Sequence, residues 1–138
     1  MSLKPLLVSA CLLGIPCRWH GRKIRPSRQL QRYLDALPEC EVVSVCPETL
    51  AGFPIPRPAV KRKNGRVYQT CAEKANRKNV TGEDVTEQFL AGAKATLEIA
   101  QSKGCTTAVL CAWSPSCDKN GVTGKILTAN GIEVVNVF

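Results

Sequence analysis

Four short apolar runs alternate with two longer amphipathic segments, and this alternation narrows the choice of fold more than any other feature. The runs cover residues 6–10, 42–45, 106–110 and 132–137. They are short, mostly rich in β-branched residues, and bounded by Gly, Pro or Cys, which is typical of buried strands. Strands that alternate with helices form α/β folds, in which the strands are mostly parallel and the crossovers right-handed.

Between these runs, apolar residues recur at helical spacing. Ser27 is placed to cap a first helix, and Asp84 is placed to cap a longer one that Gly104 ends. A short third helix is expected over residues 125–129. The residues expected to face the core are Leu30, Tyr33, Leu34 and Leu37 in the first helix, and Val85, Phe89, Ala93, Leu97 and Ala100 in the second.

The chain of 138 residues is long enough to enclose one hydrophobic core. We expect a single α/β domain over residues 1–138, with a mostly parallel, Rossmann-like or flavodoxin-like sheet flanked by helices. Residues 48–78 are the most irregular stretch of the chain. Within it we predict an elaborated proline-rich loop, followed by a small hairpin through residues 66–68. No apolar run approaches the roughly 20 residues that span a bilayer. The first ten residues do not resemble a secretion signal, so we expect a cytoplasmic protein without membrane contact.

The chain has eight cysteines, which in a reducing compartment serve as metal ligands, reactive thiols or small core residues rather than disulfides. Cys11 and Cys46 directly follow predicted strands, and Cys117 lies in the loop after a third. Because parallel strands end at one edge of the sheet, where ligands bind, we expect these three thiols to meet there. The others are interpreted as small core residues at Cys40, Cys71 and Cys105 and are left open at Cys17 and Cys111.

Two kinds of metal site are held by cysteine thiolates, a zinc site and an iron–sulfur cluster. Structural zinc usually takes four ligands from tight C-x₂-C pairs. The closest pairs here are spaced C-x₅-C, at Cys11/Cys17, Cys40/Cys46 and Cys111/Cys117. An iron–sulfur cluster is larger and is also held by cysteine. Three ligands would leave one metal position open for chemistry, but the pattern alone leaves both metals open.

Four sequence blocks resemble, in the same order, those of a known family. They are S-A-C-L-L-G at 9–14 with C-R-W-H-G at 17–21, V-C-P-E at 45–48 with P-I-P-R-P at 54–58, D-V-T-E-Q-F-L-A-G-A at 84–93, and S-P-S-C at 114–117. On these blocks the chain resembles domain of unknown function family 523, which includes the thiouracil and thiouridine desulfidases. The segment that follows Cys117 is shorter here than is usual in that family.

This resemblance implies a [4Fe-4S] cluster held by Cys11, Cys46 and Cys117, with the fourth iron free to take the sulfur of a substrate. The implied substrate is a small thiolated pyrimidine base, nucleoside or nucleotide. The implied reaction is a non-redox desulfidase reaction, in which C=S is hydrolysed to C=O and sulfide is released.

The resemblance also implies that Glu48 and Ser114 assist catalysis. Glu48 would relay a proton of the attacking water, and Ser114 would orient the substrate or hydrogen-bond a cluster sulfur. A helix cap and a turn hydroxyl are the purely structural alternatives for these two residues. Arg57, which lies between two prolines, is a candidate for binding a substrate carbonyl or phosphate, or for fixing the loop.

The charge of the chain points toward phosphate-bearing partners. Nineteen basic and eleven acidic residues give a net charge of +8. Six basic residues lie between Arg18 and Arg32, and eight lie between Arg57 and Lys78. Such patches attract phosphates, so RNA is a candidate partner, although a solvated basic face would show the same pattern. Trp19, Tyr68 and Trp113 are candidates for stacking on a base, unless the core takes them.

Two other functions also fit the sequence. A basic, metal-stabilised nucleic-acid-binding module without catalysis would account for the charge. A sulfur carrier would hold sulfide or persulfide on Cys17 or Cys111. Iron content and the conversion of a thiolated pyrimidine distinguish the desulfidase from both alternatives.

Overall fold

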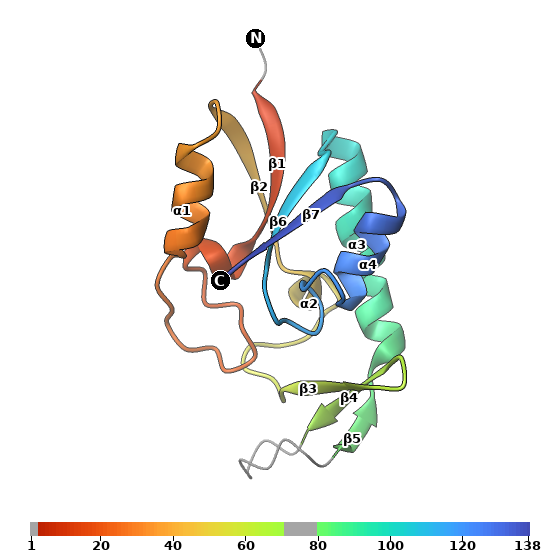
Figure 1. Cartoon of the computed structure of the whole chain (residues 1–138). Helices are drawn as coiled ribbons and strands as arrows, with labels where there is room; N and C mark the ends of the chain where they lie inside the picture. The colour runs from red at the N-terminus through yellow and green to blue at the C-terminus, as the bar shows by residue number, and fades with distance from the viewer. Residues whose placement is uncertain (1–2, 71–79) are drawn as a thin grey trace.

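A four-stranded parallel sheet forms the centre of the molecule in the computed structural model, which describes residues 3–70 and 80–138 (Figure 1). Its strands are β1 (Lys4–Ser9), β2 (Cys40–Val45), β6 (Thr107–Cys111) and β7 (Glu133–Val137), in the order β2-β1-β6-β7. All neighbouring pairs run parallel, and Leu7 of β1 lies opposite Val43 of β2 and Ala108 of β6. The predicted α/β class and all four predicted strands are therefore confirmed.

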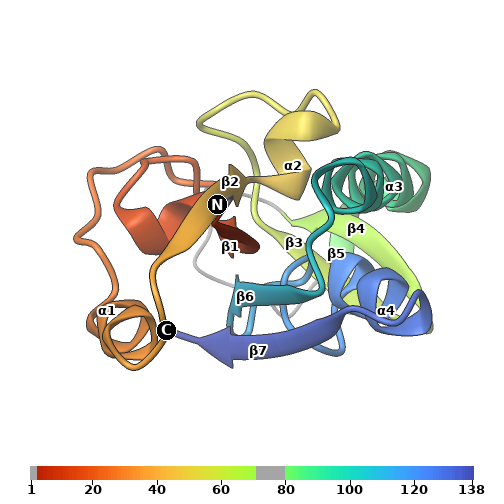
Figure 2. The same cartoon turned by 90° about the horizontal axis from the view of Figure 1, so that it is seen from above.

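Helices cover both faces of this sheet, as the view from above shows (Figure 2). One face carries α1 (Arg28–Asp35), and the other carries α3 (Thr86–Lys103) and α4 (Val122–Ala129). A short 3-10 helix, η1 (Ala10–Leu13), follows β1, and a four-residue helix, α2 (Pro47–Leu50), follows β2. Among the described residues, no helix is both long and apolar enough to cross a membrane.

The helix ends match the sequence predictions only in part. Ser27 caps α1 as predicted, because its Oγ accepts the Leu30 N–H at 3.1 Å, and Gly104 ends α3 in the left-handed conformation. The prediction that Leu37 faces the core is wrong, because α1 ends before it and its side chain is exposed. Asp84 is not the cap residue of α3; it precedes that cap, and its Oδ1 accepts the Thr86 N–H at 2.9 Å.

A second, antiparallel sheet lies below the parallel one in Figure 1. It consists of β3 (Val60–Lys63), β4 (Arg66–Thr70) and β5 (Val80–Asp84). The predicted hairpin corresponds to β3 and β4, whereas β5 was not predicted, because its V-T-G-E-D sequence lacks alternating apolar residues. A small core of its own supports this sheet, formed by Phe53, Val67, Val85 and Phe89. Cys71 lies outside the described residues.

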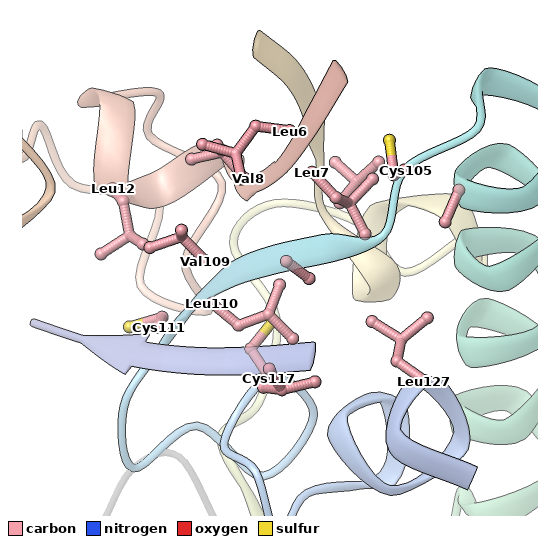
Figure 3. Close-up of a cluster of buried hydrophobic side chains, with 14 of the residues drawn as sticks. Leu6, Leu7, Val8, Leu12, Cys105, Val109, Leu110, Cys111, Cys117 and Leu127 are labelled. Carbon is pink, nitrogen blue, oxygen red and sulfur yellow. The ribbon is translucent and has the colours of Figure 1, made fainter. Parts of the chain in front are cut away.

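The main core fills the space between the parallel sheet and its helices (Figure 3). Leu7, Leu110 and Leu127 are completely buried there. Cys105 is buried near the amino end of β6, as predicted, while Cys111 lies at the other end of the same strand (Figure 3). The core therefore reaches the edge of the sheet where β1, β2 and β6 end.

Close packing of α2 on α3 depends on Gly92. A Cβ atom at this position would lie 2.2 Å from the Pro47 carbonyl oxygen, which belongs to the backbone and cannot turn away. We therefore expect Gly92→Ala to lower the free energy of unfolding in urea by about 1–3 kcal/mol. Ala91→Ser, at the exposed neighbouring position, should change it by less than about 0.5 kcal/mol. Equal stability of the two variants would contradict this packing.

Candidate active site

A cavity of about 340 Å³ lies where the strands of the parallel sheet end. Five thiols line it, those of Cys11, Cys17, Cys46, Cys111 and Cys117. The three thiols predicted to meet are thus all on this cavity, together with the two that the sequence left open. Because the thiols come from segments remote in sequence, only the folded chain brings them together.

Each of the three predicted ligands is placed by the end of a different strand. Cys11 lies in η1 directly after β1, and Cys46 is the residue that precedes α2 directly after β2. Cys117 lies in the loop between β6 and α4, and the hydroxyl of Ser9 hydrogen-bonds its thiol. Within the described residues, no group of three or more His, Cys, Asp and Glu side chains is arranged to hold a metal ion. The thiols instead stand around the cavity.

The thiols share protons along a chain of hydrogen bonds. Bonds from Cys111 and then Cys17 lower the pKa of Cys11 to about 3, and the Arg18 guanidinium adds to this effect. A bond from Cys17 lowers the pKa of Cys46 to about 5. The pKa values of Cys17 and Cys111 are raised, because these two thiols keep their protons in the same bonds. These bonds therefore favour the thiolate forms of Cys11 and Cys46.

Cys117 differs from these two thiols in its surroundings. Burial raises its pKa to about 12, although the hydrogen bond from Ser9 opposes the shift. Without a bound metal, this pKa favours the protonated thiol of Cys117 at neutral pH. A metal that binds this thiol would have to displace the proton.

Glu48 places a carboxyl on the wall of the same cavity. Burial raises the pKa of Glu48, while the positive charge of Arg57 opposes this shift. Arg57 Nε donates to Glu48 Oε2 at 2.8 Å, and Arg57 Nη2 pairs with the same oxygen. A largely enclosed carboxyl with a raised pKa is a typical proton-transfer group, because it is a stronger base than an exposed carboxylate.

Arg57 connects three segments around the cavity. Besides Glu48, its Nη2 donates to the Cys17 carbonyl at 2.8 Å and its Nη1 to the Pro54 carbonyl at 3.3 Å. Its side chain is 5% exposed. These contacts favour the loop-fixing interpretation, in which Arg57 positions Glu48. Direct contact between Arg57 and a substrate stays a prediction.

Ser114 holds the loop that carries Cys117. Its Oγ accepts the backbone N–H groups of Ser116 at 3.2 Å and of Cys117 at 3.1 Å. A hydroxyl oxygen has two lone pairs and one hydrogen. With both lone pairs engaged by the backbone, Ser114 keeps its O–H as a donor on the cavity wall.

The sequence did not assign Arg18 or Cys111 to the site. Arg18 Nη2 donates to Cys111 Sγ at 3.6 Å. The Arg18 guanidinium also lowers the pKa of Cys11. A sequence signal for Arg18 exists, because this residue directly follows Cys17 in the block at 17–21. For Cys111, the signal is its place at the carboxyl end of β6.

Comparisons with known proteins identify the family of the chain. Residues 6–137 match the family model described as 2-thiouracil desulfurase. The chain is 35% identical over 132 residues to the uncharacterized protein YbbK of Bacillus subtilis (strain 168), covering 92% of this chain and 85% of that protein. Its fold is similar to the solved structure of the [4Fe-4S]-dependent thiouracil desulfidase TudS, with a TM-score of 0.79, 30% identity, and coverage of 96% of this chain and 90% of that one.

The resemblance noted from four sequence blocks is thus confirmed over nearly the whole chain. The matched range, residues 6–137, spans every segment that lines the cavity. The chain belongs to the 2-thiouracil desulfurase family.

Proposed function

We propose that this protein is a [4Fe-4S]-dependent desulfidase that hydrolyses the C=S group of a small thiolated pyrimidine to C=O and releases sulfide. The observation that carries the proposal is one cavity lined by five thiols and by the largely enclosed carboxyl of Glu48. Membership in the 2-thiouracil desulfurase family and the similarity to TudS support it.

The residues around the cavity fit an iron–sulfur cluster. Cysteine thiolates are the usual ligands of such clusters, and each thiolate binds a different iron, so the ligands surround a volume. Cys11, Cys46 and Cys117 would hold the cluster, since they line the cavity from the ends of three different strands. The lowered pKa values of Cys11 and Cys46 keep these two thiols in the form that binds metal.

When bound, the cluster supplies a Lewis acid for the thiocarbonyl sulfur, which makes the attached carbon easier for water to attack. Glu48 takes the proton of that water, because burial raises its pKa and so makes the carboxylate a stronger base than an exposed glutamate. The water oxygen becomes the carbonyl oxygen of the product, and the sulfur leaves as sulfide, so no electrons are gained or lost.

Two further groups shape the reaction. The Ser114 O–H donates a hydrogen bond toward the polar atoms of the substrate. Arg57 holds the Glu48 carboxyl in place through Oε2. We prefer this catalytic function to a metal-stabilised nucleic-acid-binding module, because such a module would not need the buried carboxyl beside the thiols.

The direct test is conversion of 2-thiouracil by protein that is reconstituted anaerobically with iron and sulfide. We expect loss of the 2-thiouracil absorbance with release of one sulfide for each uracil formed. The same protein loaded with zinc is the control and should release none. A protein with full iron content that converts neither 2-thiouracil nor 4-thiouridine would contradict the proposed function.

A further inference from the structure

Two large aromatic side chains stand exposed beside the cavity, and we call this pair the aromatic ledge. It consists of Trp113, which also lines the cavity, and Phe138. Their ring centroids are 5.1 Å apart, with the ring planes tilted by 34°. Trp113 is 77% exposed and Phe138 60%. The sequence left open whether Trp113 belongs to the core, and this exposure excludes that role.

Specific contacts hold the backbone of both aromatic residues in place. The Trp113 backbone has a φ of +61°, in the left-handed region that bulky residues rarely adopt. Asp118 Oδ2 accepts the Trp113 N–H at 2.8 Å and so supports this conformation. The Phe138 N–H donates to Gln29 Oε1 at 2.9 Å, and the Phe138 carbonyl accepts the Ser27 hydroxyl at 2.8 Å. The fold therefore fixes an exposed aromatic surface.

The aromatic ledge continues into a cationic segment. Ser27 and Gln29, which anchor Phe138, lie within the basic segment that runs from Arg18 to Arg32. The charged residues of this segment that are exposed are Arg22, Lys23, Arg25, Arg28 and Arg32. Positive charge thus lies next to the rings.

A second cationic segment approaches the cavity from the other sheet. Val60, at the start of β3, lines the cavity, and Lys61, Arg62, Lys63 and Arg66 follow on the β3–β4 hairpin, all exposed. Arg62 Nη1 donates to the Asn120 carbonyl, which joins this hairpin to the loop that carries Cys117. Exposed cations therefore lie on two segments that each contribute residues to the cavity lining or contact a lining loop.

We infer that the aromatic ledge and the two cationic segments bind single-stranded RNA, with one base in the thiol cavity and the neighbouring base stacked on Trp113. The base in the thiol cavity is placed there on the basis of the proposed function. Stacking of the neighbouring base on Trp113 does not depend on desulfidase activity. Aromatic faces bind bases, and basic side chains bind the phosphates between them. A free base would use neither the outer ring face nor the flanking cations.

The test measures binding of an unmodified, fluorescently labelled hexauridylate to the cluster-loaded protein by fluorescence anisotropy. We expect Trp113→Ala to weaken binding about ten-fold, within the range found for single base–aromatic stacks. Trp113→Phe should restore most of the affinity, because it keeps a flat ring. Val42→Ala, which truncates an exposed apolar residue on β2, is the matched control and should bind like the unchanged protein.

Competition separates RNA from an acidic protein partner. Unlabelled hexauridylate should displace the probe much better than hexaglutamate of similar charge. Equal displacement by hexaglutamate, or equal affinity of Trp113→Ala and the unchanged protein, would overturn the inference. Because hexauridylate has no C=S group, a protein that binds it through Trp113 but does not convert 2-thiouracil would contradict only the proposed function.

Discussion

Replacing Cys46 with alanine is expected to give a folded protein that retains almost no iron. Cys46 is one of three thiols proposed to hold the cluster, and the hydrogen bond from Cys17 lowers its pKa, which favours the metal-binding thiolate. Its side chain is not part of the main core, so the substitution leaves the packing intact. The measurement is iron and sulfide content, with the visible absorption spectrum, after anaerobic reconstitution.

Cys40→Ala is the matched control for this experiment. Cys40 begins β2 and Cys46 follows the same strand, so the two variants each remove one thiol from opposite ends of one element. Cys40→Ala should bind as much iron as the unchanged protein. Full iron content in Cys46→Ala would show that Cys46 is not a ligand, and circular dichroism of both variants establishes that they are folded.

Glu48→Gln is expected to retain the cluster and to lose turnover of 2-thiouracil by about 10²- to 10⁴-fold, the usual contribution of a general base. Glutamine keeps the size of the side chain and an oxygen for Arg57, but it cannot take a proton from water. The measurement is kcat together with iron content, so that loss of the reaction is separated from loss of the cluster.

The control for this substitution is Glu41→Gln, which removes the same charge from an exposed position on β2. Its turnover should match that of the unchanged protein. If Glu48→Gln loses iron as well as activity, then Glu48 supports the site rather than the reaction. Unchanged turnover with a full cluster would remove Glu48 from the catalytic machinery.

The sequence predicted the parts of the fold that depend on local pattern. The four apolar runs gave the parallel strands, and the Ser27 cap followed from residue type alone. The meeting of Cys11, Cys46 and Cys117 around one cavity followed from topology, since parallel strands end at one edge. Neither step required knowledge of side-chain contacts.

Features that arise from contacts between distant loops were not predictable in this way. The pairing of β5 with β4 depends on neighbouring strands rather than on the composition of β5. The Arg57–Glu48 ion pair joins a loop to α2, and the Arg18–Cys111 contact joins a loop to the end of β6. The sequence left open whether Trp113 lies in the core or on the surface. Its side chain is exposed in the structure, and the Asp118 contact supports the left-handed backbone from which it projects.

The remote origin of the thiols determines when a cofactor can be acquired. The cavity forms only after β1, β2 and β6 have paired, so a nascent or denatured chain offers iron nothing more than isolated cysteines. A group that binds only the native state shifts the equilibrium toward that state. We therefore expect the cluster-loaded molecule to resist proteolysis better than its metal-free form.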